Sequence, residues 1–198
     1  MKRVLITISL AVGLSFSQNI SLSYYKSYNY EKMQNYSDAI KALIPIYKEY
    51  PKSYTVNLRL GWLFFLDRKY SNALKHYKMA SLTLPSSIEA KLGMARVYYT
   101  MQNYEKAIEI ANSILKIDFY NYYGNYYNVL ALKAKKEYKS ALAIANKMLS
   151  LYPTDILFLV ELGELYSKMG KKDKAKEIFK NILILDPNNI TAKEHLEK

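Results

Sequence analysis

Apolar residues recur at helical spacing along most of the chain. In one stretch, the i, i+3, i+4, i+7 and i+8 positions are Ala107, Ile110, Ala111, Ile114 and Leu115. These positions lie on one face of an α-helix. Similar stretches alternate with short polar turns, such as residues 101–103 and 169–171. The pattern therefore predicts an all-α protein made of helix pairs.

The helix pairs repeat with a period of 34 residues. Alanine stands at positions 39, 73, 107, 141 and 175, and proline follows twelve residues later at positions 51, 85, 153 and 187; Phe119 replaces the proline of the third unit. A period of this size is typical of stacked helix–turn–helix units. The predicted units are 20–53, 54–87, 88–121, 122–155 and 156–189, followed by a short C-terminal helix at 190–198.

Small residues also recur where two helices must cross closely. Each second helix has the alanine described above, and the first helices have Ser27, Gly61, Ala95, Val129 and Gly163. Tyrosine precedes four of the second helices, at positions 36, 70, 104 and 138. We expect these rings to be packing residues rather than ligands.

The chain resembles the tetratricopeptide repeat family. The family's Leu-Gly, Tyr, Ala, Phe and Pro pattern is matched in the last unit by Leu162, Gly163, Tyr166, Ala175, Phe179 and Pro187. The resemblance covers residues 20–198. It departs from the family early in each first helix, where no unit has the family's tryptophan. Pro45 also stands inside the second helix of the first unit.

This resemblance implies a right-handed superhelical α-solenoid whose first helices line a concave groove. Carried onto this sequence, the inward positions give a candidate partner-binding groove of Tyr24, Tyr28, Leu58, Trp62, Phe65, Arg96, Tyr99, Tyr123, Tyr126 and Lys133. We expect a peptide or helix anchored on Trp62, Phe65 and Tyr99, with Arg96 available to a carboxylate, because aromatic residues and arginine dominate interface energetics. The alternative is that these rings are ordinary packing between repeats.

The first residues resemble a secretory signal peptide. Lys2 and Arg3 precede an apolar run from Val4 to Leu14, and Ser15 to Ser17 offer a small-residue cleavage site before Gln18. The predicted organisation is a signal peptide at 1–17 and a repeat domain at 18–198; an uncleaved anchor is the alternative. The apolar run is short for a membrane span, and we expect no other segment to be long and apolar enough to cross a bilayer. The mature chain is therefore expected to be periplasmic or secreted.

Composition narrows the expected chemistry. The chain has no cysteine, which excludes disulfides, thiolate metal sites and lipidation after the leader. Loss of Lys2 and Arg3 lowers the net charge from +12 to +10, which suits an acidic protein, an anionic glycan or lipid headgroups. Lysines that solvate outer helix faces would explain the same excess. Nucleic acid is not an expected partner of an exported protein.

No catalytic constellation is evident. His76 and His195 are far apart in the repeat frame, and neither stands near a candidate serine or carboxylate pair. The six glycines form no phosphate-binding loop, and the acidic residues lack metal-ligand spacing. We therefore expect neither an enzyme nor a cofactor or metal site.

Three functions remain open. The first is a non-enzymatic adaptor of the bacterial cell envelope that holds another envelope protein or peptide; similar exported repeat proteins act in outer-membrane assembly, secretion or export. The second is a module that binds an acidic polysaccharide through tyrosine and tryptophan faces. The third is a structural subunit that dimerises through its first repeat, where Tyr24, Tyr25 and Tyr28 have no preceding helix to cover them.

Overall fold

A computed structural model describes residues 19–197, in which all regular secondary structure is helical. Residues 19–32 are helical and are followed by α2 (Tyr36–Glu49), α3 (Tyr54–Leu66), α4 (Tyr70–Thr83), α5 (Ile88–Thr100), α6 (Tyr104–Leu115), α7 (Tyr122–Ala134), α8 (Tyr138–Leu151), α9 (Ile156–Lys168), α10 (Lys172–Leu185) and α11 (Ile190–Leu196). First helices and second helices each begin at 34-residue intervals, which confirms the predicted all-α repeat fold. The predicted signal peptide lies outside the described residues.

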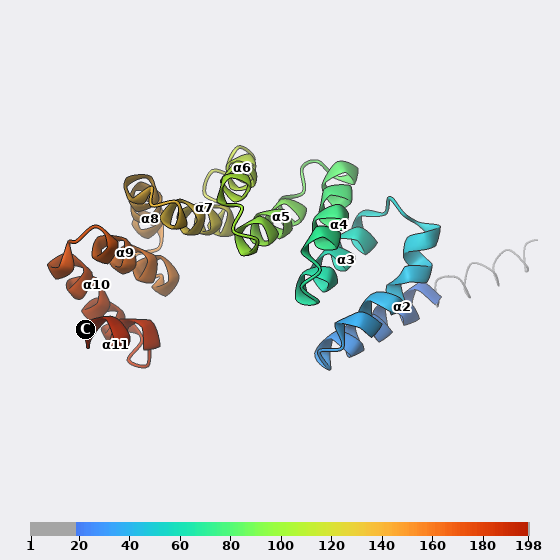
Figure 1. The fold of residues 1–198 in the computed structure, drawn as a ribbon, viewed down its shortest axis with the longest axis horizontal. Coiled ribbons are helices and arrows are strands. Elements are labelled where there is room, and N and C mark those ends of the chain that lie inside the picture. The colour runs from blue at the N-terminus through green and yellow to red at the C-terminus, as the bar shows by residue number, and fades with distance from the viewer. Residues whose placement is uncertain (1–18, 198) are drawn as a thin grey trace, which may run out of the picture. The chain divides into compact units, whose positions relative to one another are not determined.

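The chain divides into two compact units, one ending at Gly93 and the other beginning at Met94, so α5 contributes to both. In the first unit, α3 packs against α2 and α4. In the second unit, each helix from α6 to α11 packs against the next (Figure 1). Each unit therefore has the neighbour-to-neighbour packing of a repeat protein.

The repeated alanines lie in the core between packed helices. Ala39, Ala73, Ala107 and Ala141 are fully buried and Ala175 is nearly so. Glycines of two first helices lie against large rings of the following second helices. A Cβ on Gly61 would lie 2.7 Å from the Tyr77 ring, and one on Gly163 would lie 2.7 Å from the Phe179 ring. Such approaches leave no space for a methyl group. The small residues therefore specify the scaffold.

The turn within every repeat has the same backbone geometry. The residue two positions before each second helix has a positive φ, at Gln34, Arg68, Gln102, Lys136 and Gly170. In the last of these turns, Gly170 N–H donates to Ser167 O, and Lys171 N–H donates to Tyr166 O. The corresponding pair of bonds closes the other four turns. This is the Schellman arrangement, for which glycine is the favoured residue, yet only the last repeat has it.

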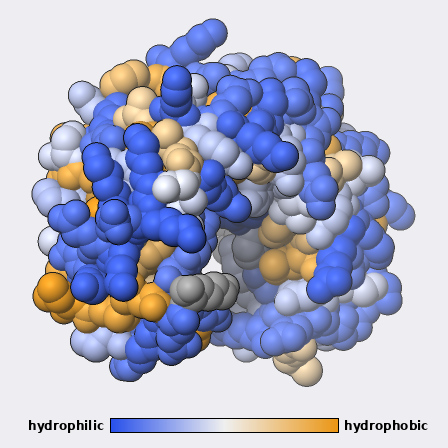
Figure 2. All heavy atoms as spheres, turned by 60° about the vertical axis from the view of Figure 1, so that its left-hand side comes forward, coloured by the Kyte–Doolittle hydropathy of each residue, from blue (hydrophilic) through white to orange (hydrophobic). Residues whose placement is uncertain are grey.

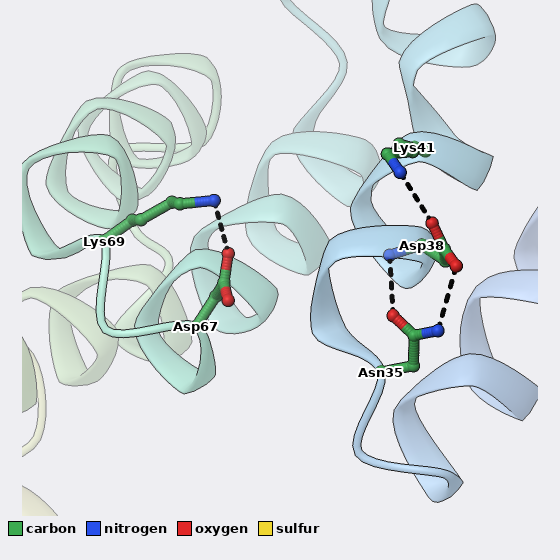
Figure 3. Close-up of polar contacts among 5 residues, drawn as sticks. All are labelled: Asn35, Asp38, Lys41, Asp67 and Lys69. Carbon is green, nitrogen blue, oxygen red and sulfur yellow. Dashed lines mark hydrogen bonds and ion pairs between the residues drawn. The ribbon is translucent and has the colours of Figure 1, made fainter.

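Side-chain caps support several helix starts. Figure 3 shows Asn35 accepting from the Asp38 N–H at 3.2 Å, while Asp38 also accepts from Lys41 at 2.8 Å. In the next repeat, Asp67 pairs with Lys69 at 2.7 Å within the turn between α3 and α4. The Asn35 contact pairs a backbone N–H that has no partner within the helix. Asn103, Asn121, Asp155 and Asn189 cap later helices in the same way.

The helix α2 continues through Pro45. Among the described residues, no helix is long and apolar enough to cross a membrane. On the face drawn in Figure 2, hydrophilic side chains predominate and apolar side chains gather in small groups. Exposed large apolar side chains include Tyr25 in the first repeat and Ile184 in the last.

Candidate partner-binding surfaces

In the first unit, Trp62 is held in a fixed position by the preceding repeat. Its Nε1–H donates to Glu31 Oε1 at 2.6 Å. Its ring stacks on Phe65 with centroids 5.8 Å apart, and Phe65 in turn lies 5.9 Å from the Tyr70 ring. Trp62 and Phe65 are half-buried. The structure therefore brings two predicted groove residues together as one aromatic surface on α3.

A buried arginine shares Glu31 with Trp62. Arg59 pairs with Glu31 and is only 9% exposed, and its guanidinium lies 3.8 Å from the centre of the Tyr28 ring. Tyr28 is 50% exposed, whereas Tyr24 packs against the core of the first repeat. Leu58 is half-buried on α3. Glu31 thus anchors both Arg59 and Trp62.

In the second unit, Lys133 takes the place that Glu31 has in the first. Its Nζ lies 2.5 Å from both Glu161 Oε2 and Glu164 Oε2. Glu161 is 5% exposed, and its burial raises its pKa against the opposing effect of Lys133. Burial also disfavours the Lys133 ammonium, but the two carboxylates outweigh this and raise its pKa. Lys133 therefore links α7 to α9 through two ion pairs.

Tyrosines line the neighbouring part of the second unit. Arg96 Nε donates to the Tyr127 hydroxyl at 2.8 Å, so the arginine expected to meet a ligand carboxylate already has a partner within the protein. Tyr99 lies 6.4 Å from Tyr127, and Tyr126 lies 5.9 Å from the buried Phe158 ring. Burial raises the pKa of Tyr126 to about 12, so its hydroxyl stays protonated.

Tyr123 differs from these residues, because its side chain is 53% exposed at the start of α7. It meets the Tyr122 ring edge-to-face at 5.1 Å. Of the ten predicted groove residues, only Tyr28 and Tyr123 are largely exposed; the other eight are half-buried. Packing between repeats therefore accounts for much of the pattern, and a binding role for these residues stays a prediction.

Arg59 and Glu161 were missed by sequence reasoning. Each stands at the sixth position of its 34-residue unit, 28 residues after the opposite charge at the twelfth position of the preceding unit. The ninth positions of the same units, Trp62 and Glu164, bond to the same twelfth-position residues. The spacing of 28 and 31 residues between bonding partners could have been found from the sequence, once the register was known.

His76 forms a further buried polar contact on α4. It is 6% exposed, its Nδ1 lies 2.9 Å from Asn57 Oδ1, and its ring stacks on Phe64 at 5.2 Å. Asn57 Nδ2 donates to the carbonyls of Pro51 and Ser53. Because the Asn57 amide nitrogen is already used, Oδ1 must be the acceptor and His76 Nδ1 must carry the hydrogen.

Burial lowers the pKa of His76 to about 4, with a smaller contribution from the Lys75 charge. The imidazole is therefore neutral at physiological pH, and it packs against the Phe64 and Tyr47 rings. Among residues 19–197, no three histidine or carboxylate side chains come close enough together to hold a metal ion.

Comparison with known families agrees with this architecture. One family model described as Tetratricopeptide repeat matches residues 64–123 and 132–194, and a second with the same description matches residues 26–83. Together they cover most of the chain. The chain belongs to the tetratricopeptide repeat family and is a protein-interaction scaffold of that general kind.

Solved structures show the same fold. A tetratricopeptide repeat protein from Parabacteroides merdae superposes with a TM-score of 0.81 at 20% identity, over 90% of this chain and 71% of that one. MamA from Desulfovibrio magneticus gives 0.77 at 14% identity, over 87% and 97%. A repeat protein of Thermus thermophilus gives 0.69 at 15% identity, over 89% and 96%. At these identities the likeness concerns the fold alone.

One curated relative matches a short segment. A protein O-mannosyl-transferase of Caenorhabditis elegans is 40% identical over 50 residues, which make up 25% of this chain and 7% of that protein. The chain thus spans only a small part of the length of that relative. The match gives no reason to expect the transferase activity here.

Proposed function

We propose that this protein is a non-enzymatic adaptor of the bacterial cell envelope that binds another envelope protein, or a peptide from it, on the faces of its first helices. The expected setting is outer-membrane assembly, secretion or export. The N-terminal sequence pattern supports the location, and the tetratricopeptide repeat family supports the role.

The observation that carries this proposal is the fixed geometry of Trp62. Its indole N–H is bonded to Glu31 and its ring is stacked on Phe65, so little side-chain entropy remains to be lost when a partner binds. A half-buried, pre-ordered aromatic pair is typical of an interface anchor. Tyr99 supplies a second aromatic position on α5.

The direct test is capture of envelope proteins by the purified mature chain. Trp62→Ala and Tyr99→Ala should each lose the partner that the wild type retains. Leu82→Ala is the matched control, because Leu82 is 74% exposed on α4 and outside the predicted groove. If all three variants retain the partner equally, the groove assignment is wrong.

The location has a separate test. The N-terminal sequence of the exported protein should begin at Gln18, and recovery of the protein in the cytoplasmic fraction alone would contradict the location.

A second candidate function is binding of an acidic polysaccharide. Phe119 and Tyr120, in the turn between α6 and α7, are 58% and 52% exposed, and Lys147 Nζ lies 4.0 Å from the Phe119 ring centre. Exposed rings beside an ammonium group suit sugar stacking combined with charge. Such binding should weaken strongly as salt rises and should be lost in Phe119→Ser; unchanged binding under both conditions would refute it.

The first repeat also offers a surface for dimerisation. Leu22, Tyr25 and Tyr28 are each about half or more exposed on residues 19–32. Sedimentation should then show a dimer that Tyr25→Ser disrupts. A monomer at high concentration would rule this contact out.

A further inference from the structure

The last repeat contains a hollow of about 440 Å³ between the end of α9, the start of α10 and α11. Ser167, Lys172, Asp173 and Lys176 contribute polar groups to its lining. Phe179 and His195 also line it, with their rings stacked 4.3 Å apart and nearly parallel. The hollow thus combines a cationic rim with the half-buried His195 ring, which stacks on the buried Phe179 ring. Its volume lies in the range of ligand sites in proteins.

Two of the rim residues depart from the repeat pattern. Lys172 stands where the four earlier repeats have tyrosine, and Lys176 stands where they have isoleucine or leucine. The earlier counterparts Ile108 and Leu142 pack against the core of the second unit. Two positions that are apolar throughout the earlier repeats are therefore exposed cations in the last one.

Lysine predominates in the segment that forms the α10 side of the hollow, where Asp173 is the acidic residue of the lining. Residues 168–180 include six lysines and only two acidic residues, Asp173 and Glu177. Within residues 19–197, no carboxylate oxygen lies within 4.0 Å of any of these six ammonium groups, by contrast with Lys133. A polar cap on a repeat array requires only polar residues. Two of the six lysines, Lys172 and Lys176, line the hollow itself, and a polar cap does not require two cations there.

We propose that this hollow is a second binding site, distinct from the aromatic surface around Trp62, and that it takes an acidic segment of a partner protein. Carboxylates of that segment pair with Lys172 and Lys176, which lie on the same side of α10 because they are four residues apart. An apolar side chain of the segment lies against the half-buried His195 ring, and Phe179 supports that ring from within the core. The aromatic lining favours a peptide over a free anion, and the concave form favours it over a lipid surface.

The probe is a fluorescein-labelled peptide of glutamate residues around a central phenylalanine, with binding followed by anisotropy at low salt. Lys172→Glu combined with Lys176→Glu should weaken binding at least tenfold. The matched control is Lys75→Glu with Lys78→Glu, which makes the same charge change at exposed positions of α4 and should weaken binding less than twofold. Lys172→Gln with Lys176→Gln gives a second, milder variant if the charge reversal impairs folding.

Other outcomes would overturn the proposal. Equal losses in the two charge-reversed variants would mean that net charge alone attracts the peptide. Absence of peptide binding, or equal binding of a peptide with alanine in place of phenylalanine, would also refute it. Inorganic phosphate that displaces the peptide at millimolar concentration would indicate a simple anion site. Preferential binding to phosphatidylglycerol vesicles would assign the lysines to a membrane surface. Trp62→Ala should leave peptide binding unchanged, so this site and the proposed groove can fail separately.

Discussion

His76 should make the stability of the first unit depend on pH. In the folded chain its pKa is about 4, whereas an exposed histidine has a pKa of about 6.5. The unfolded chain therefore binds a proton more readily than the folded chain. The stabilising contribution is fully present above pH 6.5 and is lost as the pH falls toward 4.

The size of the effect follows from the two pKa values. A difference of about 2.5 units corresponds to about 3.4 kcal/mol of unfolding free energy when the loss is complete. Between pH 8 and pH 5, the part that is lost is about 2 kcal/mol by the same linkage. The structural cause is that His76 is only 6% exposed to water. Its protonation would place a charge between the Phe64 and Tyr47 rings.

The matched variant is His76→Asn. The amide nitrogen of the new asparagine is bonded to Cγ, as Nδ1 of histidine is, so it can still donate to Asn57. The variant should be less stable than the wild type, since the ring contacts are lost, but its stability should change less with pH. Urea unfolding of both proteins at pH 8 and pH 5, followed by circular dichroism, gives the difference. Subtracting the two profiles removes the carboxylates that titrate in both proteins, Glu161 among them.

Repeat arrays can unfold in more than one step, so NMR titration of the two histidine rings is the second measurement. The His195→Gln variant assigns the signals, because the chain has only two histidines. A His76 midpoint above pH 6 would refute the reasoning. An equal loss of stability in His76→Asn and in the wild type would do the same.

Two further predictions concern the scaffold. Lys136→Gly should stabilise the protein by a few tenths to about 1 kcal/mol, because Lys136 has a φ of 64° that glycine adopts without strain; Gly170→Ala should have the opposite sign, and thermal unfolding checks both. Lys133→Met should destabilise the protein by about 3 kcal/mol or more, because it leaves Glu161 buried without its cation. Adding Glu161→Gln should restore much of that loss; if it restores nothing, the ion pair is not the cause.

Much of the fold could be predicted because its determinants are local and periodic. The alanines, the rings opposite glycine and the helix bounds all follow one 34-residue register. The turns are an instructive exception: four of the five positive-φ positions are not glycine. There, the tertiary packing of the helix pair holds a backbone conformation that the residue itself does not favour.

The candidate surfaces were harder to predict, because exposure depends on the neighbouring repeat. Trp62 and Arg96 stand at equivalent positions of successive units, yet one donates to a carboxylate and the other to a phenol. The position within the 34-residue unit predicted the helix face on which each side chain lies, but not the residue of the neighbouring repeat to which it would bond. His76 shows the same limit, since its periodic position placed it on the outer helix and gave no sign of its contact with Asn57.

The ion pairs between successive repeats show which substitutions can change binding without changing the scaffold. In one ion pair, Glu31 at the twelfth position faces Arg59 at the sixth position of the next unit. In the other, Lys133 at the twelfth position faces Glu161. The two pairs thus have opposite charges in the two orders, so neither position requires a particular residue. The charge at the sixth and twelfth positions thus serves the scaffold, and binding residues are expected at other positions, such as Trp62 and Tyr123 on the first helices and the lysines around the α10 hollow.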